Sequence, residues 1–134
     1  MQLHLCDIRG VAEDLGVERA DGTHLQTNPS SVLGTNEVTP LSMAAAYAGI
    51  AAGGLYCAPI VVDKVIDPSG AELPGQAKDC RQAVDPEVAA TAAYAMAGVM
   101  TGGTGGASNP GDGIPIIGKT GTTDSSNQTW VITS

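Results

Sequence analysis

Aromatic side chains are scarce in this chain of 134 residues, which contains one tryptophan, three tyrosines and no phenylalanine. Hydrophobic residues still make up 43 % of the chain, a share typical of globular rather than disordered proteins. Because alanine and glycine dominate, any core must be built from small side chains that bury little area per residue. We therefore expect a core that is weak unless more polypeptide packs around it.

Basic residues are also few, with six against 14 acidic ones and a net charge of −8. The absence of any Lys/Arg cluster disfavours nucleic acid and anionic membrane surfaces as partners. No apolar run approaches the roughly 18 residues of a transmembrane helix, and residues 1–5 lack the basic start of a signal peptide. We therefore expect no membrane contact by this segment.

The three cysteines lie at positions 6, 57 and 80, without the spacing of a metal site and with few histidines to join them. No metal site is therefore predicted. Two interpretations stay open for the thiols. They can be buried and reduced, or Cys57 and Cys80 can form a disulfide that closes the strand region between them, which requires an oxidising compartment and leaves Cys6 over.

The first half of the chain predicts two helices. One spans residues 7–16, with Asp7 as its cap and apolar residues along one stripe. Residues 20–36 are rich in turn-forming residues and indicate a long surface connection. A second helix over residues 40–52 follows a capping threonine and has proline in its first position. Because it is apolar on almost every face, we expect it to be buried.

In the second half, residues 55–66 predict one or two strands, and Asp67-Pro68-Ser69-Gly70 predicts a hairpin turn. A further alanine-rich helix is expected over residues 86–100. Strands over 114–121 and 129–133 are expected on either side of a polar turn. Since helices and strands do not alternate as βαβ units, the pattern favours an α+β fold with an antiparallel sheet packed with alanine-rich helices.

Residues 113–120, Gly-Ile-Pro-Ile-Ile-Gly-Lys-Thr, match the letters of a phosphate-binding loop. Such a loop must curl around a phosphate and lead directly into a helix. The Ile-Pro-Ile-Ile stretch instead favours an extended chain, and the residues after Lys119 favour a turn. Nucleotide binding through Gly113–Thr120 is therefore retained only as an alternative.

The competing interpretation places Lys119-Thr120-Gly121 on the edge of a strand. Alternation then directs Lys119 and Gly121 to one side and Thr120 and Thr122 to the other. Gly121 has no side chain, so a peptide substrate can lie close to the strand and pair with its backbone. A cation and two hydroxyls suit a carboxylate. K-T-G also accompanies S-x-x-K in β-lactamases and penicillin-binding proteins.

Longer stretches resemble the transpeptidase domain of the class A, bifunctional penicillin-binding proteins. The resemblance covers residues 28–131 and is nearest to actinobacterial members, judging by Cys57, Cys80 and the loop at 109–113. Three segments carry it: a helix segment, an approach to the active site and a closing motif. In this sequence they are Leu-Gly-Thr-Asn-Glu-Val-Thr-Pro-Leu-Ser-Met-Ala-Ala-Ala-Tyr-Ala at 33–48, Gly-Val-Met-Thr-Gly-Gly-Thr-Gly at 98–105, and Gly-Lys-Thr-Gly-Thr-Thr at 118–123 with Trp130.

The resemblance implies a partial serine β-lactamase/penicillin-binding transpeptidase fold and acyl transfer between peptidoglycan stem peptides, with β-lactams as acylating ligands. It makes Lys119 and Thr122 catalytic, since Lys119 sets the electrostatics and the N–H of Thr122 supplies half of an oxyanion hole. Thr120 and Thr122 would hold the carboxylate of a D-Ala-D-Ala donor, within a substrate-binding stretch that also includes Gly121 and Thr123. No cofactor is implied.

The sequence departs from that family in having no S-x-x-K, since none of its lysines has a serine three residues before it. Ser125-Ser126-Asn127 fits S-x-N by letters but follows the K-T-G strand, so we interpret it as turn chemistry. We expect residues 1–134 to be the C-terminal portion of one transpeptidase domain, lacking the N-terminal part with S-x-x-K and S-x-N and the final strands and helix.

On this interpretation the segment alone is inactive and its partner is the rest of its own domain. The protein would lie at the extracytoplasmic face of the cell membrane, anchored by a missing N-terminal segment. An alternative is a non-catalytic remnant, or a fragment that complements a separate chain.

Overall fold

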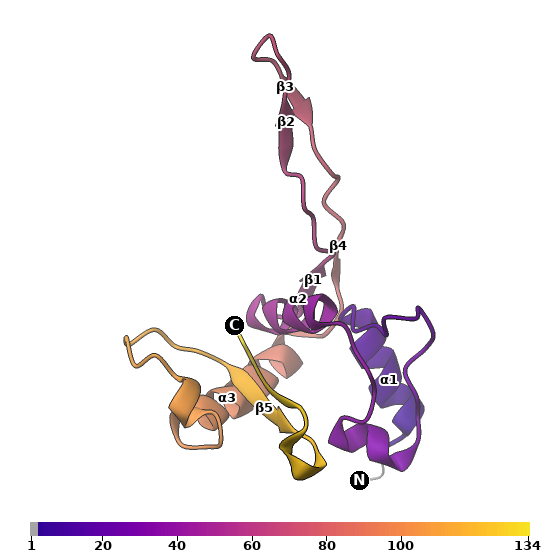
Figure 1. Ribbon diagram of the computed structural model, residues 1–134, viewed down its shortest axis with the longest axis vertical. Helices are drawn as coiled ribbons and strands as arrows, with labels where there is room; N and C mark the ends of the chain where they lie inside the picture. Colours follow the sequence, from indigo (N-terminus) through magenta and orange to yellow (C-terminus); the bar gives the residue numbers. More distant parts are fainter. Residues whose placement is uncertain (1–2) are drawn as a thin grey trace.

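The computed structural model describes residues 3–134, which form three helices and three antiparallel strand pairs in an α+β arrangement (Figure 1). The helices are α1 (Leu5–Asp14), α2 (Pro40–Ala51) and α3 (Pro86–Thr101). The strands are β1 (Leu55–Cys57), β2 (Lys64–Ile66), β3 (Glu72–Pro74), β4 (Cys80–Gln82), β5 (Gly118–Thr122) and β6 (Thr129–Thr133). Short 3₁₀ turns cover Pro29–Leu33, Gly106–Ser108 and Asp124–Ser126.

The two alanine-rich helices begin where the sequence predicts. The Thr39 hydroxyl accepts a hydrogen bond from the Ser42 amide at 3.2 Å, and Pro40 takes the first helical position of α2. The Asp85 carboxylate accepts from the Glu87 amide at 2.9 Å at the start of α3. Both caps satisfy amides that the first helical turn leaves without a backbone partner.

Helix α1 corrects one prediction, because it begins at Leu5 rather than after Asp7. His4 occupies the capping position without a side-chain hydrogen bond, and Asp7 lies in the first turn. There its negative charge meets the positive end of the helix dipole without serving as the cap. The helix ends before Gly16, which has a φ of +79° and packs so closely on the Tyr56 ring that a Cβ would lie 2.2 Å from it.

Of the one or two strands predicted over residues 55–66, the structure has two, β1 and β2, and each has a return strand on the far side of the hairpin turn. β1 pairs with β4 and β2 with β3, both antiparallel. Residues 58–79, here called the arm, project far from the helices (Figure 1). A disulfide joins the cross-strand partners Cys57 and Cys80 at its base. Of the two interpretations of the thiols, the structure contains the disulfide.

The strand predicted over 114–121 starts later, with residues 114–117 outside any assigned strand. Pro115 has no amide to donate to a ladder. The pairing nevertheless extends past β5, because Ile117 and Ser134 exchange two backbone hydrogen bonds of 3.0 and 3.1 Å. β5 and β6 then pair in register, with Gly118 opposite Thr133 and Thr122 opposite Thr129.

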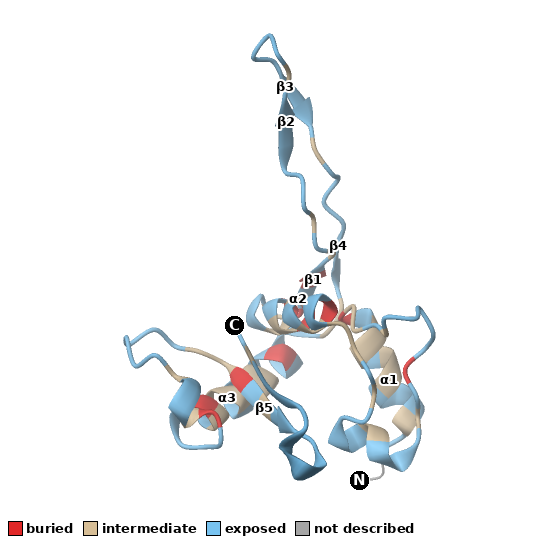
Figure 2. Ribbon diagram, viewed as in Figure 1, coloured by how far each residue is buried: buried red, intermediate tan, exposed pale blue. Residues whose placement is uncertain are grey.

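Few residues are buried, and they lie in separate small patches on the helices, the strands beside them and the loop next to α1 (Figure 2). The buried apolar residues are Leu15, Leu25, Ala46, Tyr56, Ala89 and Met100. The expectation that α2 is buried was wrong, because only three of its residues are buried while Leu41 is 64 % exposed. α2 contacts β1, α3 and β6.

Candidate functional site

The end of α3 positions both the K-T-G strand and the turn that faces it. Met100 lies at the end of α3 with none of its side chain exposed. Its sulfur lies so close to Gly105 and Gly118 that a Cβ on either glycine would be 2.6 Å from it. The two glycines thus let the turn after α3 and the start of β5 approach the same side chain. The Asn109 side chain fixes this corner by donating to the Met100 carbonyl at 3.1 Å.

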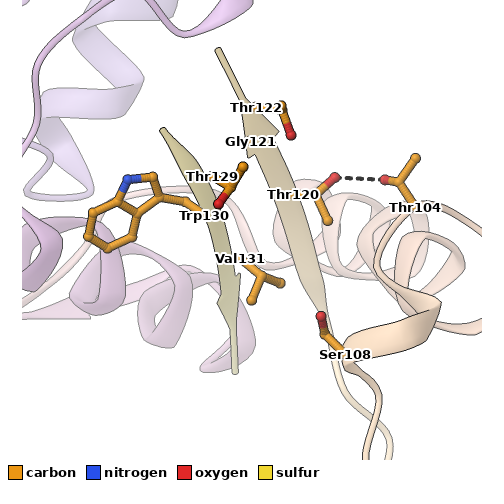
Figure 3. A pocket seen from close by; sticks show the side chains of 8 residues that line it. All are labelled: Thr104, Ser108, Thr120, Gly121, Thr122, Thr129, Trp130 and Val131. Atoms are coloured by element: carbon orange, nitrogen blue, oxygen red, sulfur yellow. Dashed lines mark hydrogen bonds between the residues drawn. The ribbon is translucent and has the colours of Figure 1, made fainter. Parts of the chain in front are cut away.

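A cleft of about 410 Å³ opens beside β5 (Figure 3). The glycine-rich turn after α3 forms one bank, and β5 and β6 form the other. The lining residues are Thr104, Ser108, Thr120, Gly121, Thr122, Thr129, Trp130 and Val131. Hydroxyl groups predominate in this lining, so the cleft offers neutral hydrogen-bond donors to a ligand.

The alternation predicted for β5 agrees with the cleft. Thr120 and Thr122 project from β5 on the side that faces Thr104 (Figure 3), and Gly121 between them leaves the backbone open. The Thr104 and Thr120 hydroxyl oxygens are 2.7 Å apart. Lys119 is not among the lining residues, and its ammonium group donates to the Thr120 carbonyl at 2.8 Å. Its charge therefore lies beside the cleft.

Thr123, which the sequence placed in the substrate-binding stretch, lies in the turn after β5. Its hydroxyl accepts from the Gln128 amide at 2.9 Å, and its own amide donates to the Gln128 carbonyl at 3.0 Å. Ser125 and Ser126 follow with φ values of 59° and 56°. The S-x-N letters thus occupy a tight β5–β6 turn, in agreement with their interpretation as turn chemistry.

The conformation of residues 113–120 differs from that of a phosphate loop. Lys119 and Thr120 lie inside strand β5, and the next element is the turn to β6. A phosphate loop needs a helix to begin at this point, with its amide groups directed at the ligand. The geometry therefore favours the strand-edge interpretation of Lys119-Thr120-Gly121.

Sequence reasoning reached the side of the cleft opposite β5 only as residues 98–105, the segment that resembles an approach to the active site, and it assigned no role to Thr104 or Ser108. Both residues lie in the glycine-rich segment that follows α3. The signal available was the run Thr-Gly-Gly-Thr-Gly-Gly over residues 101–106, in which the glycines around Thr104 permit a tight turn. Within residues 3–134 no three His, Cys, Asp or Glu side chains gather as metal ligands.

Comparison with known proteins agrees with this geometry. Residues 8–130 match the family described as the penicillin binding protein transpeptidase domain. The chain therefore belongs to the penicillin-binding protein transpeptidase domain family. The fold predicted from the resemblance is confirmed as well, since solved penicillin-binding proteins share it.

Two mycobacterial structures are among the similar folds. The imipenem acyl-enzyme complex of penicillin-binding protein A from Mycobacterium tuberculosis has a TM-score of 0.73 and 25 % identity, and the match covers 94 % of this chain and 33 % of that one. PonA1 from the same organism has a TM-score of 0.72 and 27 % identity, covering 92 % and 36 %. Both agree with the actinobacterial resemblance.

Curated relatives show how small a share of a whole protein the chain represents. Penicillin-binding protein 1A of Aquifex aeolicus is 33 % identical over 103 residues, which are 77 % of this chain and 14 % of that protein. Penicillin-binding protein 2a of Streptococcus pneumoniae is 33 % identical over 135 residues, which are 89 % and 18 %. The chain thus spans less than a fifth of these relatives.

Proposed function

We propose that this chain supplies the carboxylate-binding wall of a serine D,D-transpeptidase site within a larger domain. That domain would cross-link peptidoglycan stem peptides and be acylated by β-lactams. The observation that carries the proposal is the cleft beside β5, where Thr120 and Thr122 face a ligand across the open backbone of Gly121. Two hydroxyl donors at alternate positions on one side of a strand suit the terminal carboxylate of a D-Ala-D-Ala peptide or the carboxylate of a β-lactam.

The roles of the individual groups follow from their positions. A ligand carboxylate between Thr120 and Thr122 would bring the adjacent acyl group alongside the strand backbone. The Thr122 amide would then donate to the oxyanion as the tetrahedral intermediate forms, an effect worth about 2.7–4 kcal/mol in comparable sites. Lys119 would add positive potential beside the cleft and draw the anionic end of the ligand toward it.

The reactive serine and its base would come from the rest of the domain, because no S-x-x-K occurs in residues 1–134. Exposed apolar side chains support such a partner. Leu41 on α2 is 64 % exposed, and Val88 and Tyr94 on α3 are 58 % and 85 % exposed. A surface of this kind is suited to cover by further polypeptide, either the same chain continued or a complementing fragment.

We place the whole protein at the extracytoplasmic face of the membrane, where peptidoglycan is cross-linked. Among the described residues, no helix combines the length and the hydropathy needed to cross a bilayer. An anchor would therefore belong to another part of the protein. The disulfide between Cys57 and Cys80 supports an oxidising compartment.

Fluorescent penicillin labelling tests the proposal in two proteins, the 134-residue chain and the PonA1 transpeptidase domain carrying this chain in place of its matching segment. Only the chimaera should be labelled, because a covalent mechanism needs its nucleophile. Lys119→Ala in the chimaera should slow labelling by about 100-fold or more. Lys78→Ala, in the arm, is the matched control and should label at the parent rate. Labelling of the chain alone, or equal rates for Lys119→Ala and the parent, would refute the proposal.

A further inference from the structure

The paired hydroxyls of Thr104 and Thr120 are not explained by the proposed function, on which the following inference rests. Their oxygens are 2.7 Å apart, although the residues lie 16 positions apart in the sequence (Figure 3). Either oxygen can be the donor. Each hydroxyl carries one hydrogen and two acceptor lone pairs.

The arrangement of hydrogens decides what Thr120 can offer to a ligand. A carboxylate only accepts hydrogen bonds, so Thr120 must direct its single hydrogen at the ligand. That hydrogen is available only when Thr104 is the donor in the pair. If Thr120 donates to Thr104 instead, it presents lone pairs to the carboxylate and repels it.

Backbone hydrogen bonds hold the turn that contains Thr104 against the end of α3. The Gly105 amide donates to the Val99 carbonyl at 3.0 Å, and the Gly106 amide donates to the Gly103 carbonyl at 3.1 Å. A Cβ on Gly103 would lie 2.9 Å from the Val99 Cα, so the turn folds tightly back on the last turn of α3. The backbone at Thr104 is thereby held against the end of α3, which places the Thr104 side chain at the cleft.

We propose that Thr104 is a positioning residue that donates its hydroxyl hydrogen to Thr120, so that Thr120 donates its own to the carboxylate of the ligand. The chain of donors runs from the Thr104 hydroxyl to the Thr120 hydroxyl to the carboxylate. Thr104 itself contacts no ligand atom in this arrangement. Its contribution is to donate to a lone pair of the Thr120 oxygen, so that Thr120 makes a hydrogen bond to Thr104 and still has its own hydrogen free for the carboxylate.

The test titrates the 134-residue chain with N-acetyl-D-Ala-D-Ala and, separately, with its C-terminal amide, following the backbone amide signals of β5 by NMR. The wild-type chain should bind the acid and discriminate against the amide, which lacks the carboxylate. Thr104→Val keeps the shape but removes the donor, and should weaken acid binding about fivefold. Thr104→Ser should restore binding to within about twofold, because it keeps the hydroxyl.

Thr101→Val is the matched control, because the Thr101 hydroxyl donates a hydrogen bond to the Ala97 carbonyl at 3.1 Å and does not line the cleft. It should bind like the wild type. Equal acid affinity in Thr104→Val and wild type overturns the inference, as does failure of Thr104→Ser to restore binding. A wild-type chain that binds acid and amide equally overturns the proposed function too. If the NMR spectrum shows that the 134-residue chain is unfolded, the same variants are compared in the PonA1 chimaera by their rate of penicillin acylation. Thr104→Val should then slow acylation about fivefold, and Thr104→Ser should restore it.

Discussion

The cleft region and the arm are held together in different ways. The fully buried Met100 side chain joins α3, the glycine-rich turn and β5, whereas every residue of β2 and β3 in the arm is exposed. The arm is held instead by local polar groups and one covalent bond. The Gln76 side-chain oxygen accepts from the Val61 and Val62 amides at 2.6 and 2.9 Å, and the disulfide closes the base. Side-chain packing therefore holds the cleft region together, whereas hydrogen bonds and one disulfide hold the arm. The four changes below test this difference.

Met100→Ala should have the largest effect. Removing a fully buried methionine leaves a cavity between α3, the glycine-rich turn and β5, at a cost of about 2–5 kcal/mol in free energy of unfolding. Urea unfolding followed by the fluorescence of Trp130 in β6 measures it. Tyr94→Ala on the same helix is the control, since its side chain is 85 % exposed, and should change stability by about 0.5 kcal/mol or less. Equal losses in the two variants would contradict a packed corner at Met100.

Replacing both Cys57 and Cys80 with alanine should cost about 3 kcal/mol, because the disulfide restricts the unfolded chain across a loop with a sequence separation of 23. NMR should show the amide signals of the arm moving while those of β5 stay in place. Cys6→Ala removes the exposed free thiol and serves as the control, with a change of about 0.5 kcal/mol or less. Displaced β5 signals in the double variant would mean that the arm and the cleft are not separate.

Arg81→Met should produce a smaller loss of about 1 kcal/mol. The Arg81 guanidinium donates to the Asp14 carbonyl at the end of α1 at 2.8 Å and lies 4.6 Å from the centre of the Tyr56 ring. Lys64→Met is the control, because the Lys64–Glu72 pair in the arm is exposed and such pairs contribute little. Thermal unfolding compares the two, and a larger shift for Lys64→Met would reverse the interpretation.

The smallest effect concerns the turn of the arm at acid pH. Hydrogen bonds from Ser69 and Ala71 hold the pKa of Asp67 below that of an ordinary aspartate. Because the pKa of Asp67 is lower in the folded than in the unfolded chain, its ionised carboxylate stabilises the folded state. This stabilisation is complete above the unfolded pKa and is lost as pH falls through the folded pKa. The Ser69 and Ala71 amide signals should therefore move only below about pH 4. In Asp67→Asn they should not titrate, and persistent titration there would assign it to another group.

Local features of this fold were predictable from the sequence, because each depends on a few neighbouring residues. The caps at Thr39 and Asp85 satisfy amides two or three positions away, and the alternation along β5 follows from strand geometry alone. Asp7 misled the prediction for α1 because a residue of capping type can also stabilise the first turn through its charge.

Features that depend on distant residues were not predictable. Thr104 meets Thr120 because Met100 brings Gly105 and Gly118 onto one sulfur atom, and no spacing in the sequence reveals that contact. The choice between one and two strands over residues 55–66 stayed open in the sequence, because it depends on their partners β4 and β3. The exposure of α2 could not be read from its composition, because an apolar helix is buried only where other elements cover it.

The contacts of Met100 determine the distance across the cleft. Because the same side chain contacts both banks of the cleft, the gap between the hydroxyls is set within a single stretch of chain, residues 98–122. Displacement of residues 98–133, which include β6, against α2 would turn the whole cleft and leave the distance between these hydroxyls unchanged. The contacts of α2 with α3 and β6 would then set the direction in which the cleft opens, while Met100 sets its width.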